Sequence, residues 1–136
     1  LAENIEKMMS EYGVNTFIDG CALGFDTIAA ETVIEMLEKY QNIKLVMYLP
    51  CYGQSKMWKE SEQFRYRMVF SKADKIIYIT ESVYTDDCMK LRNLKMIKDS
   101  SFCIAFCLMQ KSGTGFTLRN AENVGIQIVN IADEMY

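Results

Sequence analysis

The sequence predicts an α/β domain of three layers, in which helices cover both faces of a mainly parallel sheet of about five strands. Apolar segments of strand length alternate with segments of helical periodicity along the whole chain. The strand segments are continuous apolar runs rather than alternating ones, which is typical of strands buried on both faces. At 136 residues, we expect one domain covering residues 1–136.

The predicted elements alternate in a regular order. Apolar residues at helical spacing predict a first helix over residues 1–12, and Gly13 is placed to end it. Asp86 and Asp87 are placed to cap a later helix that runs to Lys98. The other predicted helices cover about 25–40, 54–71 and 115–125, and the predicted strands cover 16–18, 43–49, 75–80, 102–109 and 126–131.

Two glycine-bearing turns each follow a strand and open a helix. The first is Gly-Cys-Ala-Leu-Gly at 20–24, and the second is Ser-Gly-Thr-Gly-Phe-Thr at 112–117. The first N–H groups of a helix have no partner within the helix and carry partial positive charge, so such a turn suits phosphate. Because both turns leave the carboxyl ends of parallel strands, we expect them at one edge of the sheet. The pair favours a nucleotide-like ligand.

The candidate ligand-binding residues lie on these two turns and on the helix over 87–98. Asp26 is either a helix cap or a carboxylate that contacts a ribose hydroxyl or a base. Arg92 suits bidentate recognition of phosphate, although the lysines of the same helix are typical of a solvated face. The full set is Gly20, Cys21, Ala22, Gly24, Asp26, Arg92, Asn93, Ser112, Gly113, Thr114, Gly115 and Thr117.

Composition argues against several classes of protein. The formal charge of −3 and the acidic pI disfavour a general binder of nucleic acid or of an anionic membrane. No apolar run approaches the roughly 20 residues that cross a bilayer, and there is no signal peptide. Five cysteines without a Cys-x-x-Cys pair, and without any histidine, predict no metal site and reduced thiols in a cytoplasmic protein.

The order of motifs resembles the YpsA-like branch of the Rossmann-like SLOG superfamily. This superfamily also includes the DNA-processing protein A family and the "Lonely guy" phosphoribohydrolases. The matching segments are 17–31 and 49–54, with Trp58. Further matches are Arg65-Tyr66, Tyr84-Thr85, Cys88-Met89, Arg92-Asn93, Gly113-Thr114 and residues 117–121. The resemblance implies a Rossmann-like fold and a nucleotide-type ligand.

Two features depart from the family pattern. Members usually begin with a further strand that ends in a Thr-Gly-His-Arg-like motif beside the pocket, and this chain has no counterpart. We therefore expect either a truncated chain or a pocket without one wall. The phosphoribohydrolases carry a glutamate three positions after the Thr that Thr114 matches, and Thr117 stands there instead. Their Met-x-x-Arg-x-x-x-Met helix is matched by Met89, Arg92 and Met96, so the resemblance implies binding rather than hydrolysis.

Three hypotheses follow. The first is a cytoplasmic protein that binds a nucleotide or its derivative (AMP, ADP-ribose or NAD-like), with phosphates on the N–H groups after Gly20 and Gly113. The second is a phosphoribohydrolase-like N-glycosidase of nucleoside monophosphates, with Asp19, Asp26 or Glu31 as its carboxylate. The third is single-stranded DNA binding, which the acidic balance disfavours. Superfamily relatives commonly pair through helices, so a homodimer is plausible.

Overall fold

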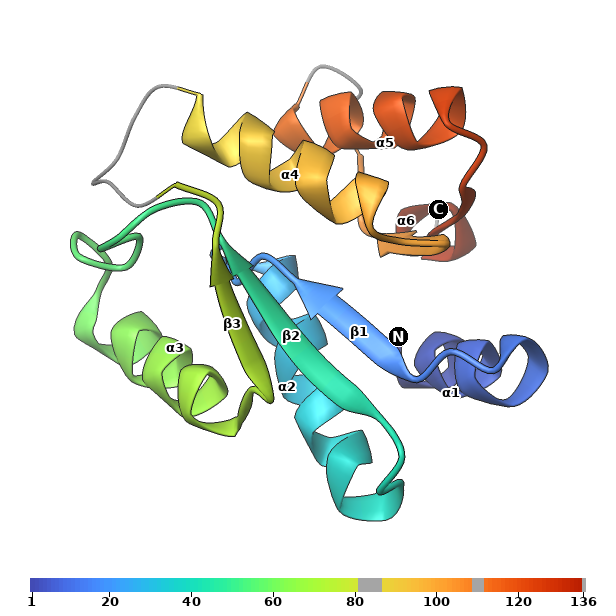
Figure 1. The fold of residues 1–136 in the computed structure, drawn as a ribbon, viewed down its shortest axis with the longest axis horizontal. Coiled ribbons are helices and arrows are strands. Elements are labelled where there is room, and N and C mark those ends of the chain that lie inside the picture. Colours follow the sequence, from blue (N-terminus) through green and yellow to red (C-terminus); the bar gives the residue numbers. More distant parts are fainter. Residues whose placement is uncertain (81–86, 109–111, 136) are drawn as a thin grey trace.

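The structure is a computed structural model and describes residues 1–80, 87–108 and 112–135 (Figure 1). Helices and strands alternate along the whole described chain, which begins with a helix and ends with a short helix after the last strand. The elements are α1 (Ala2–Tyr12), β1 (Thr16–Asp19), α2 (Phe25–Lys39), β2 (Lys44–Leu49), α3 (Glu60–Lys72), β3 (Lys75–Tyr78), α4 (Cys88–Lys98), β4 (Phe102–Ala105), α5 (Gly113–Asn123), β5 (Gln127–Asn130) and α6 (Ile131–Met135).

All the described strand pairs are parallel, as the apolar runs predicted. β1, β2 and β3 form one sheet in that order, and β4 and β5 form a second. The predicted single sheet of five strands is therefore divided between β1 and β4. In the described part of the chain, one edge of β1 and one edge of β4 carry no ladder partner, and Figure 1 shows these two strands on either side of the division.

Helices cover both faces of the first sheet, as predicted. Successive residues of a strand point to opposite faces. Leu45, Met47 and Leu49 of β2 are fully buried in one cluster with Ala30 and Val33 of α2. On the opposite face, the hydroxyl of Tyr48 donates to Asp99 at the end of α4 (2.7 Å). α4 therefore lies across the sheet from α2, and α5 lies beside α4 (Figure 1).

Asn130 explains why two predicted strands are shorter than expected. The predicted strand over 102–109 ends at Ala105, because the backbone of Cys107 exchanges two hydrogen bonds with the Asn130 side chain (both 3.0 Å) rather than continuing the ladder. The same side chain accepts from the amide of Ala132 (3.2 Å) and so begins α6, which the sequence did not predict.

The start of α3 also differs from the prediction. The helix expected over 54–71 begins at Glu60, after turns that include Gly53 at φ 73°. Gln63 donates to the carbonyls of Ser55 (2.9 Å) and Lys56 (3.1 Å), which holds these turns in place of a helix. Asp87 is the N-cap of α4, at the position that the sequence predicted, but among the described residues its side chain makes no capping hydrogen bond; Asp86 lies outside the described residues.

Candidate functional site

The turn after β1 has two glycines for two different reasons. A Cβ on Gly20 would lie 2.7 Å from Nη1 of Arg92, so only glycine leaves room for the guanidinium. Gly24 is the N-cap of α2 at φ 88°, a backbone conformation that residues with a Cβ rarely adopt. Cys21 between them is itself left-handed at φ 53°. The turn is therefore sharply bent and closely approached by α4.

Two amides of this turn already bind carboxyl groups of the chain. The amide of Cys21 donates to Asp19 (2.6 Å), and the amide of Ala22 donates to Asp26 (3.3 Å). Thr27 closes the turn from the other side, since its hydroxyl donates to the carbonyl of Ala22 (3.0 Å). Asp26 thus binds an amide that precedes its helix, a variant of the expected capping role. A phosphate on these two amides would have to displace the carboxyl groups.

Arg92 reaches this turn from α4 and is only 4% exposed. Its Nη1 donates to the carbonyl of Gly20 (2.7 Å), and its Nε donates to Asn93 (2.7 Å). Its Nη2 contacts the sulfur of Met89 (3.5 Å). No carboxylate of the described residues lies within ion-pair distance of it. A buried cation held mainly by neutral groups is costly to fold, which makes it a candidate for ligand contact.

The two acids beside Arg92 are shifted toward their neutral forms. Burial raises the pKa of Asp19 well above its ordinary value, and repulsion from Asp26 raises that pKa further. Burial also raises the pKa of Asp26, while the charge of Arg92 and the amide of Ala22 oppose the rise. Burial also raises the pKa of the Cys21 thiol, and the negative charge of Asp19 raises it further. Cys21 is therefore a poor nucleophile.

Gln54 also supports the turn, although it is not among the site residues that the sequence predicts. Its amide nitrogen contacts the carbonyls of Gly20 (3.5 Å) and Cys21 (3.4 Å), and its oxygen accepts from Arg92 (3.4 Å). The only signal in the sequence was its place at the end of the matched motif over 49–54. Asp19 was likewise considered only as a substitute catalytic acid.

The second glycine turn opens α5. Ser112 is the N-cap, and its hydroxyl accepts from the amide of Gly115 (3.0 Å). The hydroxyl of Thr117 donates to the carbonyl of Gly113 (3.1 Å), so it is used within the helix. Gly113 and Thr114 are exposed at the start of the helix. Residues 109–111, which lead into the turn, lie outside the described part.

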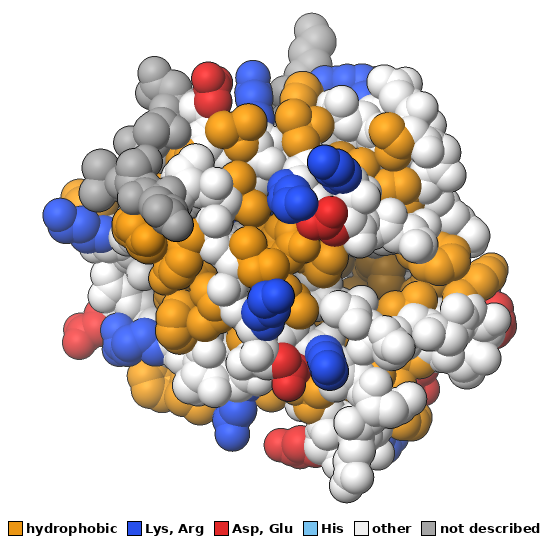
Figure 2. All heavy atoms as spheres, viewed as in Figure 1, with side chains coloured by type: hydrophobic (Ala, Val, Ile, Leu, Met, Phe, Trp, Pro, Cys, Tyr) orange, Lys and Arg blue, Asp and Glu red, His pale blue; other side chains and the backbone are white. Residues whose placement is uncertain are grey.

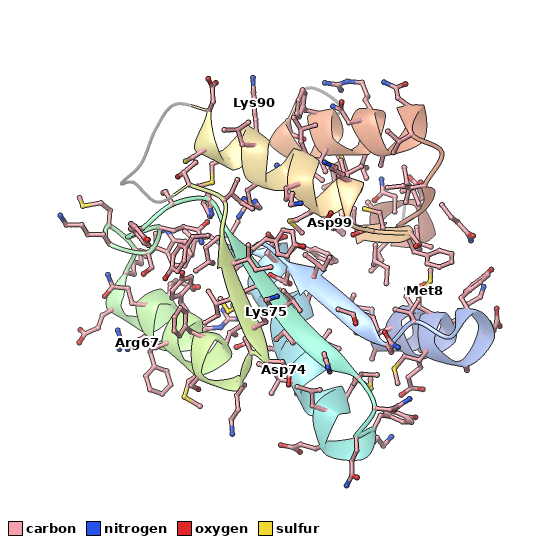
Figure 3. All side chains as sticks on the ribbon, viewed as in Figure 1. Met8, Arg67, Asp74, Lys75, Lys90 and Asp99 are labelled. Atoms are coloured by element: carbon pink, nitrogen blue, oxygen red, sulfur yellow. The ribbon has the colours of Figure 1, made fainter. Side chains whose placement is uncertain are left out.

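Two aromatic contacts relate the second turn to its surroundings. The ring of Phe25, at the start of α2, stacks with Phe106 beyond β4 (centroids 6.2 Å apart). This contact brings the carboxyl ends of β1 and β4 to the same edge of the molecule. Lys90 rises from α4 (Figure 3), and its ammonium lies 5.4 Å from the ring of Phe116 in the first turn of α5. Lys90 is exposed, as expected for a solvated face of this helix, and its positive charge also lies near the second turn.

Glu31 lies away from both turns. It forms an ion pair with Arg65 (2.5 Å) between α2 and α3, where both side chains are more than one third exposed. The hydrogen bond to Arg65 lowers its pKa. Of the three carboxylates considered as substitutes for the hydrolase glutamate, only Asp19 and Asp26 are therefore beside Arg92.

A cavity of about 420 Å³ separates the two sheets. Every residue of β1 lines one wall, Phe102 and Ile104 of β4 line another, and Asp19 and Asp26 lie at its carboxyl end. Leu1, Ile5 and Met8 of the N-terminal segment also line it. Figure 2 shows a hollow with hydrophobic walls on this side of the molecule, and Met8 is labelled there in Figure 3. Among the described residues, two strand edges without ladder partners therefore border the cavity, and Asp19 and Asp26 make one end of it acidic.

Comparison with known sequences identifies the family. The YpsA sequence model, described as the YspA SLOG family, matches residues 1–125. The chain belongs to the YpsA SLOG family. A UPF0398 protein of Bacillus cereus strain B4264 is 32% identical over 105 residues, which are 76% of this chain and 57% of the relative. A UPF0398 protein of Bacillus thuringiensis strain Al Hakam is 31% identical over the same shares. The chain thus spans a little over half the length of these relatives.

Membership of the YpsA SLOG family fits the Rossmann-like arrangement and a protein of the nucleotide-binding type. In the described part of the chain, no group of three His, Cys, Asp or Glu side chains is arranged to hold a metal ion. None of the described helices combines the length and the apolar character needed to cross a membrane.

Proposed function

We propose that this chain binds a nucleotide or nucleotide derivative, with AMP, ADP-ribose and NAD as the first ligands to test. The site is the carboxyl edge of the strands, between the turn after β1 and the start of α5. The buried guanidinium of Arg92 carries the proposal, because it is 4% exposed and has no carboxylate within ion-pair distance among the described residues. An anionic or hydroxyl-rich ligand would offset the cost of burying it.

The two turns receive different parts of the ligand in this proposal. The amides of Cys21 and Ala22 are already bonded to Asp19 and Asp26, so a phosphate there would meet two acids. The start of α5 has exposed Gly113 and Thr114 and the charge of Lys90 near its first turn. We therefore assign the phosphate to α5 and the ribose hydroxyls to Asp26 and Arg92. This changes the initial expectation that both turns hold phosphate.

Titration calorimetry tests the proposal directly. AMP, ADP-ribose and NAD are compared with adenosine, which lacks the phosphate, on this chain and on the longer Bacillus cereus relative. Arg92→Lys keeps the positive charge but loses the several N–H donors of the planar guanidinium. We expect the affinity to fall by about tenfold or more, which corresponds to the loss of one charge-assisted hydrogen bond. Lys98→Ala, at the far end of the same helix, is the matched control and leaves affinity unchanged. Failure of every nucleotide to bind either protein refutes the proposal.

The raised pKa values of Asp19 and Asp26 support a second candidate, the N-glycosidase. A general acid must hold its proton near neutral pH, and burial is the usual means of arranging this. Release of free base from AMP, measured by chromatography, is the test. Asp26→Asn abolishes turnover in this case, while Glu31→Gln, at the Arg65 ion pair, keeps it. No free base from the unsubstituted protein excludes the reaction with AMP.

Single-stranded DNA is less well supported. On the face shown in Figure 2, lysines and arginines are scattered among acids rather than gathered in a basic groove. A phosphate backbone needs a continuous basic track. A filter-binding assay at low and moderate salt separates this function from the binding of a small ligand.

A further inference from the structure

Two cysteines that are far apart in the sequence meet in the interior. The sulfurs of Cys51 and Cys88 are 3.9 Å apart, and the residues are 37 positions apart in the chain. Cys51 follows Pro50 after β2 and is 1% exposed, whereas Cys88 is the first residue of α4 and is fully buried. The sequence predicts reduced thiols, and no spacing of the five cysteines indicates this contact.

Each cysteine of the pair lies on the same chain segment as a group that supports the turn after β1. Cys88 is one helical turn before Arg92 on α4, and Arg92 donates to the carbonyl of Gly20 (2.7 Å). Cys51 is three residues before Gln54, which contacts the carbonyls of Gly20 and Cys21 and accepts from Arg92. A covalent link between Cys51 and Cys88 would therefore join the two segments that hold this turn.

The contact also suits bond formation. A disulfide needs its sulfurs about 2.05 Å apart, so the two sulfurs, now 3.9 Å apart, would have to approach by roughly 2 Å. Burial raises the pKa of Cys51, the contact with Cys88 raises it further, and the charge of Arg92 opposes the rise. Both thiols are buried, so they react slowly, through brief opening of the structure around them.

We propose that Cys51 and Cys88 are a redox modification site, which forms a reversible disulfide and fixes α4 to the end of β2. The oxidant is a small disulfide or a diazene such as diamide. A small disulfide is attacked by one thiolate to give a mixed disulfide and one small thiol. The second thiolate then displaces the other small thiol, so two electrons and two protons pass from the cysteines to the oxidant. With diamide, the N=N bond takes up the same two electrons and two protons.

The test oxidises the folded protein with diamide, alkylates the remaining thiols and maps the peptides by mass spectrometry. The expected product has lost two hydrogens, keeps three alkylated cysteines of the five, and carries one cross-linked pair of peptides that contain residues 51 and 88. Dithiothreitol restores all five thiols. The oxidised form also has a higher midpoint of urea denaturation, and the amides of Cys21 and Ala22 exchange their hydrogens more slowly.

Serine variants provide the controls. Cys51→Ser and Cys88→Ser each abolish the cross-link, whereas Cys103→Ser on β4 leaves it intact. If a serine variant fails to fold, the peptide map of the unsubstituted protein decides alone. The proposal is overturned by a different pairing, by a product that carries only adducts of single cysteines, or by retention of all five thiols. These readouts need no ligand, so they are independent of the proposed nucleotide binding.

Discussion

The guanidinium of Arg92 occupies the place where a side chain of Gly20 would begin. A Cβ on Gly20 would lie 2.7 Å from Nη1, and the same nitrogen donates to the Gly20 carbonyl at 2.7 Å. The residues are 72 positions apart. A side chain at residue 20 would therefore force the guanidinium of Arg92 to shift from its present contacts.

Gly20→Ala tests this relationship. The new methyl group would push the buried guanidinium from its contacts, so we expect a loss of about 1–3 kcal/mol in the free energy of unfolding, as for other overpacked interiors. Gly113→Ala is the matched control, since a Cβ there has nothing within 4 Å, and its effect stays within about 0.5 kcal/mol. Urea denaturation measures both. Equal effects at the two glycines would contradict the close packing of Arg92.

Asp26→Asn tests the electrostatics of the site. The pKa of Asp26 is raised in the folded protein, mainly by burial. Its contribution to stability is therefore fully present below the unfolded pKa of about 4 and is lost as the pH rises through the folded value. Asparagine keeps an oxygen for the Ala22 amide but cannot ionise. We expect the stability of the variant, relative to the parent, to improve between pH 4 and pH 8.

Denaturation midpoints at pH 4, 6 and 8 measure this change. The control is Glu38→Gln, at an exposed position of the same helix, for which we expect no such trend. A difference between Asp26→Asn and the parent that is constant with pH, or that grows in favour of the parent, contradicts the raised pKa.

Tyr48→Phe tests the contact between β2 and α4. The hydrogen bond to Asp99 lowers the pKa of that acid, while burial, followed by the same bond, raises the pKa of Tyr48 to about 12. We expect the variant to lose about 1–2 kcal/mol near neutral pH. The part of this destabilisation that depends on ionised Asp99 becomes smaller as the pH falls through the lowered folded pKa of Asp99. The part that depends on the protonated hydroxyl of Tyr48 becomes smaller as the pH rises from about 10, the unfolded pKa of tyrosine, through about 12, the folded pKa of Tyr48.

Urea denaturation of the Tyr48→Phe variant at pH 3, 7 and 11 checks these signs. Tyr52→Phe, at a position that is 44% exposed, is the control, and we expect little change at any pH. A cost that is the same at pH 3 and pH 7 would show that Asp99 is not the partner that matters.

The cavity between the sheets leads to a prediction about strand pairing. A synthetic peptide of four or five alternating valines and isoleucines, ending in Gly-Arg, should bind between β1 and β4. Among the described residues, each of these strands has one edge that lies at the cavity without a ladder partner, and Asp19 and Asp26 lie at the end where the arginine would arrive. We expect slower hydrogen exchange in β1 and β4 and a higher melting temperature.

Two altered peptides make this prediction specific. One has proline at alternate positions and lacks the ladder donors, and the other replaces the arginine with glutamate. The proline peptide should not bind, and the glutamate peptide should bind more weakly. Protection that appears equally with all three peptides would indicate general coating of the apolar walls rather than strand addition.

The alternation of strands and helices, the parallel direction of the strands and the family were all predictable from local patterns. Gly13 ends α1 in the left-handed conformation, as expected from its position after the last apolar residue. The lengths of β4 and β5 were not predictable in the same way. They depend on the side chain of Asn130, which binds Cys107 across 23 positions. The residues that neighbour Asn130 in the sequence do not indicate such a contact.

By itself, the sequence determined where apolar and polar residues alternate, and so which segments become strands, which become helices and where the glycine turns fall. These are properties of near neighbours, fixed by the spacing of side chains along one element. Only the tertiary structure decided which groups meet at those turns. In the folded protein, two amides of the first turn donate to Asp19 and Asp26. Arg92 lies against Gly20, and Cys51 contacts Cys88. Each of these contacts joins atoms whose distance is set by the packing of whole elements, and no local pattern specifies that packing.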